Sequence, residues 1–144
     1  AIPLRRKSAG RASDMASAAD DIAQGVMAKW ADAFARFDAD AQSQLYSRHA
    51  LFYGSNPTLY RGREGVKSYF TSLPQWDTRS VRFADVTAEA AGSDVVTMAG
   101  TANFTAGTAA LSVKITWVIV REDGDWKIVS HHVSATEALI DRVR

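Results

Sequence analysis

Apolar side chains in the first part of the chain recur every three or four residues, the spacing of one face of an α-helix. Between residues 14 and 37 the charged side chains lie off that face, and the spacing joins Ile22, Val26, Trp30, Ala33, Phe34 and Phe37. The pattern therefore predicts one long amphipathic helix over residues 14–37, with Ser13 or Asp14 as its N-cap.

Shorter elements are predicted between residues 38 and 74. The stretch "DADAQSQLYS", residues 38–47, favours a second helix that ends near Tyr46. A short strand over residues 49–54 and a turn at "SNP" follow. Residues 62–73 predict a third helix, which Pro74 stops.

From residue 79 the apolar positions alternate with polar ones, which is typical of β-strands. Strands are predicted over residues 79–90, 94–106, 110–121 and 125–135. Helices first and an antiparallel meander afterwards indicate an α+β fold. Three N-terminal helices should pack on one face of a strongly curved, mostly antiparallel sheet, giving a cone-shaped domain.

The turn "REDGDW" sets the direction of two adjacent histidines. It predicts a three-residue loop at residues 122–124. With that loop Ile115 pairs with His131, and His131 shares a sheet face with Trp117. His132 then points to the opposite face, because neighbouring strand residues alternate. A two-residue loop would shift the pairing by one.

Both faces of this hairpin are apolar, so each needs a cover. The helices can cover only one face. An uncovered apolar patch is unusual on a monomer, which predicts a homodimer through the face that carries Val118, Val120, Trp126 and Ile128.

Charge is unevenly distributed along the 144 residues. Residues 1–12 carry four basic side chains and no acidic one, so the remainder has 17 − 4 = 13 basic and 16 acidic residues, a net charge of −3. We expect residues 1–12 to be a flexible basic tail and residues 13–144 to form a single domain. A mildly acidic body argues against a nucleic-acid partner.

Other composition features exclude several classes of site. The chain has no cysteine, and therefore no thiol nucleophile or thiolate metal site. No apolar run approaches the roughly 18–20 residues of a membrane span, so we expect no membrane partner and a cytoplasmic location, with export to the periplasm left open. His131 and His132 point apart and His49 is distant in sequence. We therefore expect no metal and no cofactor.

The stretch from Trp117 to Ser134, "WVIVREDGDWKIVSHHVS", resembles the nuclear-transport-factor-2-like superfamily, as do the three N-terminal helices and the helix start "GREGV". The similarity is greatest to the SnoaL-like branch, near the association domain of calcium/calmodulin-dependent kinase II. It implies a cone-shaped, cystatin-like fold with a pocket at its open end and dimerisation through the sheets. Members include isomerases, dehydratases, hydrolases and assembly modules, so the fold alone does not assign a function.

The carboxylates that the resemblance implies for steroid isomerases are missing. No Asp or Glu occurs between Asp40 and Glu64, or between Asp94 and Glu122. This argues against the isomerase mechanism and against carboxylate-dependent epoxide hydrolysis. His131 remains as a candidate general base, with Tyr46, Tyr53 or Lys114 as hydrogen-bond donors. Alternatively, His131 caps the pocket wall and bonds a backbone carbonyl or a hydroxyl.

The leading interpretation is a small-molecule-binding domain, non-catalytic or weakly catalytic, for a small apolar or weakly polar ligand. The predicted ligand-binding residues are Trp30, Phe34, Tyr46, Tyr53, Trp117 and His131. Trp76 is either a pocket lip or a covered loop residue. The alternatives are a SnoaL-like enzyme acting on a small hydrophobic substrate, and an oligomerisation module.

Overall fold

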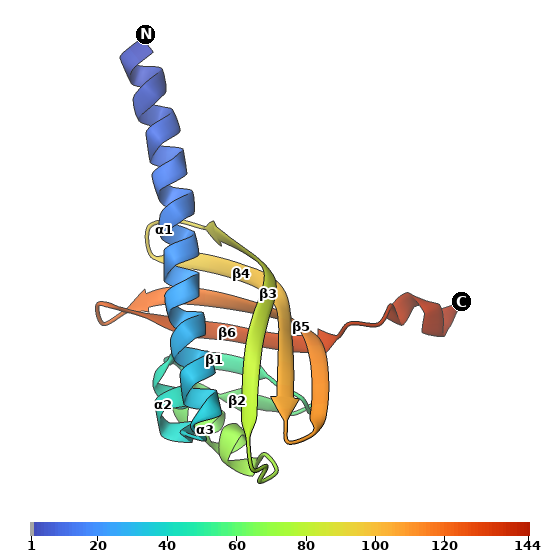
Figure 1. The fold of residues 1–144 in the computed structure, drawn as a ribbon. Coiled ribbons are helices and arrows are strands. Elements are labelled where there is room, and N and C mark those ends of the chain that lie inside the picture. The colour runs from blue at the N-terminus through green and yellow to red at the C-terminus, as the bar shows by residue number, and fades with distance from the viewer. Residues whose placement is uncertain (1) are drawn as a thin grey trace.

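The structure, a computed structural model, describes the backbone of residues 2–144 and the side chains of residues 18–144. Three helices, α1 (Ile2–Ala35), α2 (Ala39–Gln44) and α3 (Gly62–Ser72), are interleaved with two short strands, β1 (Tyr46–Tyr53) and β2 (Leu59–Arg61). Four long strands follow: β3 (Arg79–Ala90), β4 (Val95–Ala106), β5 (Ala109–Glu122) and β6 (Asp125–Ala135). A 3₁₀ turn, η1 (Leu139–Val143), projects from the body (Figure 1).

The six strands form one sheet in the order β2-β1-β6-β5-β4-β3, antiparallel except for the parallel pair β1–β6. The sheet curves around α1, and the helices lie on its concave side (Figure 1). In β3 the register shifts between Ala84 and Thr87, where Asp85 has a positive φ of 52°. Such a bulge bends a strand. The predicted α+β architecture of N-terminal helices on a curved, mostly antiparallel sheet is confirmed.

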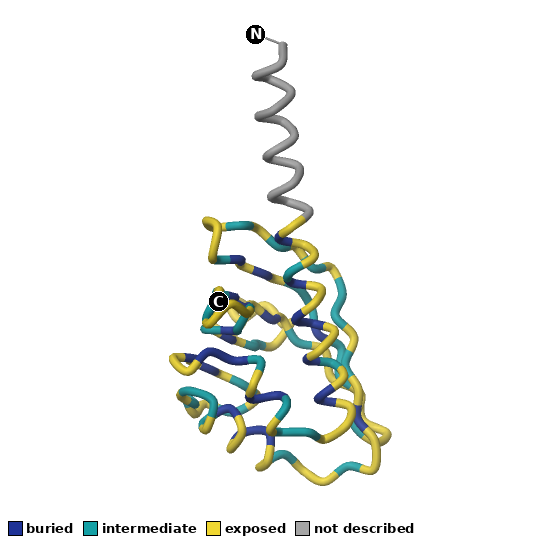
Figure 2. The backbone as a smooth tube through the Cα atoms, turned by 90° about the vertical axis from the view of Figure 1, so that its left-hand side faces the viewer, coloured by how far each residue is buried: buried dark blue, intermediate teal, exposed yellow. Residues whose placement is uncertain are grey.

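Of the predicted stripe of α1, Val26, Trp30, Ala33 and Phe34 are buried, whereas Phe37 lies beyond the helix end at Ala35 and is 39% exposed. Figure 2 shows the buried stripe along this helix. Its members are Ala19, Ala23, Val26, Met27, Trp30, Ala33 and Phe34. The helix begins earlier than predicted, at Ile2. The side chains of residues 1–17 lie outside the described ones, so the flexible tail over residues 1–12 stays a prediction.

Helix α1 ends in a left-handed turn at Phe37, whose φ is 57°. The Asp38 amide donates to the Ala33 carbonyl at 3.0 Å, which closes this turn. Arg79 holds it from the sheet: its Nε donates to the Phe34 carbonyl at 2.6 Å, and its guanidinium lies over the rings of Phe34 and Phe37. A cation at a helix C-terminus also interacts favourably with the helix dipole. Arg79 therefore fixes the end of α1 against β3.

The hairpin between β5 and β6 differs from the prediction. Glu122 pairs with Asp125, so the loop has two residues, and both Asp123 and Gly124 have positive φ, of 53° and 77°. This is the geometry of a type I′ turn, whose twist matches that of paired strands. The predicted three-residue loop is wrong.

A second irregularity restores the predicted side-chain directions farther from the turn. Ile119 pairs with Ile128 but Val118 pairs with Ser130, so β6 carries one extra residue at position 129. Relative to the predicted register, the β5–β6 pairing is shifted by one residue at the loop and by one more at this bulge. Because strand side chains alternate between faces, a total shift of two returns each side chain to its predicted face. Trp117, rather than Ile115, pairs with His131.

On the turn side of the bulge, the predicted outer face needs correction. Ile128 is fully buried beside Ile119. Trp126 packs against the core and lines a shallow groove with Ile22 of α1. Neither residue belongs to the outer face, because the two-residue loop shifts the register of this part of β6 by one residue and so exchanges its faces. Val118 remains on the outer face, opposite Thr97 and Ser130.

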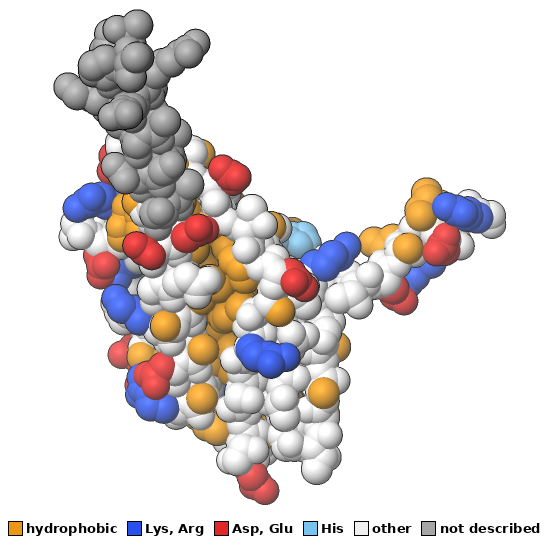
Figure 3. Space-filling model, turned by 45° about the horizontal axis from the view of Figure 1, so that its top comes forward, with side chains coloured by type: hydrophobic (Ala, Val, Ile, Leu, Met, Phe, Trp, Pro, Cys, Tyr) orange, Lys and Arg blue, Asp and Glu red, His pale blue; other side chains and the backbone are white. Residues whose placement is uncertain are grey.

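The surface carries charges of both signs. Figure 3 shows acidic and basic side chains interspersed over the face in view. Over the part of the chain that the structure describes, no helix combines the length and apolar character needed to cross a membrane.

Candidate ligand-binding cavity

A cavity of about 260 Å³ lies between the helices and the concave side of the sheet. Aromatic rings line it from four elements: Trp30 and Phe34 from α1, Phe52 from β1, Tyr69 and Phe70 from α3, and Phe104 from β4. Its remaining lining includes Trp76 after α3 and the small residues of the β4–β5 turn, Ala106 and Ala109. Within the described residues, no Asp, Glu, Lys or Arg lines it.

His131 brings an imidazole into this wall, and its position follows from the strand pairing. It lies on β6 between Trp117 of β5 and Phe52 of β1, and only 3% of it is exposed. The Phe52 and His131 rings are 4.2 Å apart between centroids. Its neighbour His132 is exposed on the opposite face, against the ring of Tyr53. The predicted directions of the two histidines are confirmed.

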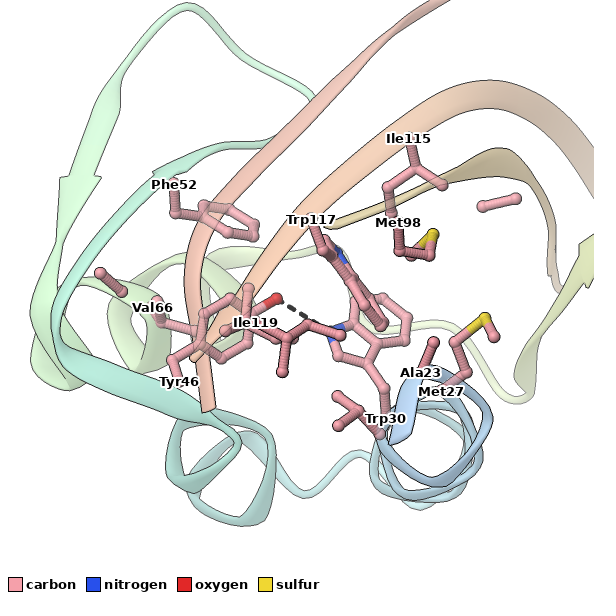
Figure 4. Packing of buried hydrophobic residues seen from close by; sticks show 14 of the residues in the cluster. Ala23, Met27, Trp30, Tyr46, Phe52, Val66, Met98, Ile115, Trp117 and Ile119 are labelled. Atoms are coloured by element: carbon pink, nitrogen blue, oxygen red, sulfur yellow. Dashed lines mark hydrogen bonds between the residues drawn. The ribbon is translucent and has the colours of Figure 1, made fainter. Parts of the chain in front are cut away.

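Three aromatic side chains form a hydrogen-bonded chain that ends on His131. Trp117 Nε1 donates to His131 Nδ1 at 2.9 Å. The Tyr46 hydroxyl lies 2.8 Å from the same Nδ1 and accepts a hydrogen bond from Trp30 Nε1 at 2.9 Å. Figure 4 shows the Trp30–Tyr46 bond within the packed core, with Trp117 beside it. Arg63 supports this arrangement by donating from Nε to the Tyr46 carbonyl at 2.8 Å.

This chain determines the protonation of the imidazole. An indole nitrogen can only donate, so Nδ1 of His131 must accept, and the ring hydrogen of the neutral form must sit on Nε2. The Tyr46 hydroxyl, which accepts from Trp30, directs its own hydrogen to Nδ1. Burial lowers the pKa of His131 to about 3, and the nearby His132 adds to this decrease. Burial likewise raises the pKa of Tyr46 well above its ordinary value. Both groups are therefore neutral at pH 7.

The Nε2 atom of His131 is the free end of this network. It makes no hydrogen bond within the described residues. Among those residues, the only buried side-chain N and O atoms without a partner are those of the Gln42 amide. Nε2 therefore keeps accessible surface, and it does so at the cavity that His131 lines. What the arrangement offers a ligand is an N–H donor, since neither ring nitrogen has a free lone pair to act as a base.

A second polar group lies in the cavity wall at Tyr69. Its hydroxyl accepts from the Ser55 amide at 3.0 Å and lies 2.7 Å from the Ser55 hydroxyl. Gly54 leaves the space for it, because a Cβ at that position would come within 2.5 Å of the Tyr69 ring. Unlike His131 Nε2, this hydroxyl already has partners.

The structure brings some of the predicted site residues together and separates others. Trp30, Phe34 and His131 line the cavity, and Trp76 lines it as well, which favours the pocket-lip alternative. Tyr46 and Trp117 lie behind the wall, 0% and 1% exposed, and reach the cavity only through His131. Tyr53 and Lys114 are exposed, and Tyr53 lies on the outer face beside His132. Neither lines the cavity, because strand alternation turns them outward.

Sequence reasoning missed Phe52 and Phe104 as cavity residues. Phe52 enters the wall because β1 pairs in parallel with β6, which puts it opposite His131. A parallel pair between the first and last strands leaves no local sequence signal, whereas a hairpin leaves a turn motif. Alternation along residues 94–106 could have placed Phe104 on the same face as Ala102 and Met98, both of which are buried.

Metal-binding geometry is missing from the described residues, where no group of three or more His, Asp or Glu side chains is placed to hold an ion.

Comparisons with known proteins agree with this architecture. The SnoaL-like domain model matches residues 23–138. No curated protein matches the chain. A Xanthomonas campestris protein named for the calcium/calmodulin-dependent protein kinase II association domain is 20% identical, with a TM-score of 0.71 over 81% of this chain and 87% of that one.

Two further solved structures have the same fold. An NTF2-like protein of unknown function from Pseudomonas putida is 17% identical, with a TM-score of 0.74 over 87% of this chain and 92% of that one. The protein Aln2 from a Streptomyces species is 19% identical, with a TM-score of 0.74 over 85% of this chain and 94% of that one. At these identities the structures support the fold alone. The family match covers most of the chain, which therefore belongs to the SnoaL-like domain family.

Proposed function

We propose that this chain is a small-molecule-binding domain that holds a compact apolar ligand in the aromatic cavity. The observation that carries the proposal is a wall of aromatic rings with one unsatisfied polar atom, Nε2 of His131, and no ionisable carboxylate among the described residues that line it. Such concave, mostly apolar sites with a few placed polar groups are typical of ligand pockets.

The same observation favours binding over acid–base catalysis. A general base needs a free lone pair and a pKa near the working pH. His131 has its Nδ1 lone pair engaged by two donors, and burial lowers its pKa to about 3. His131 therefore serves to anchor a ligand and does not abstract a proton.

The test is retention of a ligand by the purified chain. Native mass spectrometry before and after denaturing extraction should find a small molecule bound to the wild type. The variant Ala106→Phe, which fills the cavity, should lose it. Ala99→Phe, on the exposed side of the same strand, is the matched control and should retain it. Equal retention by both variants would place the ligand elsewhere.

We also propose that the outer face of the sheet is the contact surface of a homodimer. Leu51 and Tyr53 of β1 are 46% and 41% exposed there, next to Ser130 and His132 of β6. Large apolar side chains in such a row are typical of interfaces. Val118 continues the face on β5.

A further inference from the structure

We infer that the cavity selects an uncharged aromatic ligand that presents a carbonyl-type oxygen to Nε2–H of His131. The inference rests on the proposed function, since it names the class of ligand for the same cavity. It assigns Trp117 and Tyr46 a positioning role: they keep His131 in the form that can only donate.

The Nε2–H group of His131 is the donor that faces the ligand. Trp117 has no alternative to donating, so a tautomer with hydrogen on Nδ1 would oppose two N–H groups at 2.9 Å. The hydrogen therefore stays on Nε2, at the cavity. A ligand atom without a lone pair at that point leaves a desolvated donor unpaired, which is unfavourable. An acceptor oxygen satisfies it.

The same wall limits the charge of the ligand. A carboxylate in this cavity would meet only neutral donors, the Nε2–H of His131 and the hydroxyls of Ser55 and Tyr69, and no Lys or Arg of the described residues lines the wall. Burying an ion without a counter-charge is strongly unfavourable. A cation could lie against the aromatic rings, but it would face the positive end of the Nε2–H bond, and the described wall supplies no carboxylate. The ligand is therefore neutral.

The cavity also limits the size and shape of its ligand. At about 260 Å³ the cavity is smaller than the roughly 300–1,000 Å³ of sites for drug-sized ligands. Its wall offers ring faces and edges from Trp30, Phe52 and Phe70. These suit a flat ligand of one or two fused rings, because aromatic groups pack favourably in stacked and edge-to-face arrangements. A ketone, an amide or a quinone of that size combines the flat shape with the acceptor.

Matched probes of nearly equal shape test the inference. Acetophenone carries the acceptor oxygen, α-methylstyrene replaces that oxygen by a CH₂ group, benzoate adds a negative charge and phenyltrimethylammonium a positive one. Calorimetric titration of the wild type at pH 7 should show acetophenone binding roughly tenfold more tightly than α-methylstyrene, and neither ion binding measurably. His131→Phe should remove the preference, whereas His49→Phe, at an exposed position that does not line the cavity, should keep it.

The outcomes separate the two levels of the proposal. Equal affinity for acetophenone and α-methylstyrene, or tighter binding of either ion, overturns the ligand class and leaves an apolar binding cavity. Failure of all four probes to bind overturns both. Should His131→Phe not fold, long-range ¹H–¹⁵N correlation spectra of the wild type still decide the tautomer. A protonated Nδ1 would refute the inference.

Discussion

Acidification from pH 7 to pH 5 should destabilise the fold through His131. In the folded chain this imidazole is buried, and its pKa is lowered from 6.5 to about 3. In the unfolded chain the ring returns to water and to its ordinary pKa of about 6.5. The unfolded state therefore binds a proton at pH 5 while the folded state does not. Acid favours the state that binds more protons. The contribution of His131 to the free energy of unfolding is therefore complete above pH 6.5 and is lost as the pH falls toward 3.

The size of the effect follows from the two pKa values. Between pH 7 and pH 5 the free energy of unfolding should decrease by about 2 kcal/mol at 25 °C. For a chain of this length that corresponds to a midpoint lower by roughly 4–8 °C. The carboxyl groups of Asp38, Glu122 and Asp125 also have lowered pKa values. Their contribution is lost mainly below pH 5, which is why the window ends there.

Urea unfolding followed by tryptophan fluorescence at pH 7, 6 and 5 measures the effect. His131→Asn is the informative variant, because its side-chain oxygen can accept from Trp117 and Tyr46 but does not titrate. It should lose about 2 kcal/mol less than the wild type over this window. His49→Asn, at an exposed position outside this network, should behave as the wild type does. If the wild type and His131→Asn lose equal stability, His131 is not held neutral by its surroundings.

Three further predictions concern glycine, the outer face and the N-terminus. Gly54→Ala should destabilise by about 1–3 kcal/mol in thermal unfolding, because the new methyl group displaces the Tyr69 ring. Gly25→Ala, in open space on α1, should instead stabilise by about 0.5–1 kcal/mol, and the reverse order would contradict this packing. Val118→Glu should shift the proposed homodimer toward monomer in analytical ultracentrifugation, and an unchanged dissociation constant would move the interface elsewhere. Deleting residues 1–11 should hardly change the thermal midpoint, and a loss of several degrees would show that they pack.

The periodicity of the sequence predicted the three helices and five of the six strands, although several ends differ and the short strand β2 was missed. The apolar stripe of α1 and the alternation of β3 to β6 are local patterns, because a residue's place in a helix or a strand determines which neighbours share its face. The lack of carboxylates on the pocket-facing strands was equally a property of the sequence. The α+β class followed from the periodicity, and the family resemblance rested on the stretch from Trp117 to Ser134, the three N-terminal helices and the helix start "GREGV".

The inward direction of His131 was predicted correctly, although the predicted loop was one residue too long. Asp123 and Gly124 were correctly read as a turn, but both residues adopt positive φ and the loop has two residues. The bulge at position 129 then compensates. Asp-Gly is itself a preferred pair for a two-residue type I′ turn, so the sequence carried the signal for the observed loop. The same glycine also suits a three-residue loop, and the prediction took that alternative.

Local patterns in the sequence account for most of the helices and strands, the aromatic character of the core and the adjacency of the two histidines. Three features exist only in the folded chain: Phe52 lies against His131, Tyr53 faces outward beside His132, and Trp30, Tyr46 and Trp117 join in one hydrogen-bonded chain. They join residues that are far apart along the chain, as Tyr46 and His131 are at a separation of 85 residues. Their contact, and the protonation of the imidazole that follows from it, exist only once β1 has paired with β6 and α1 has closed over the sheet.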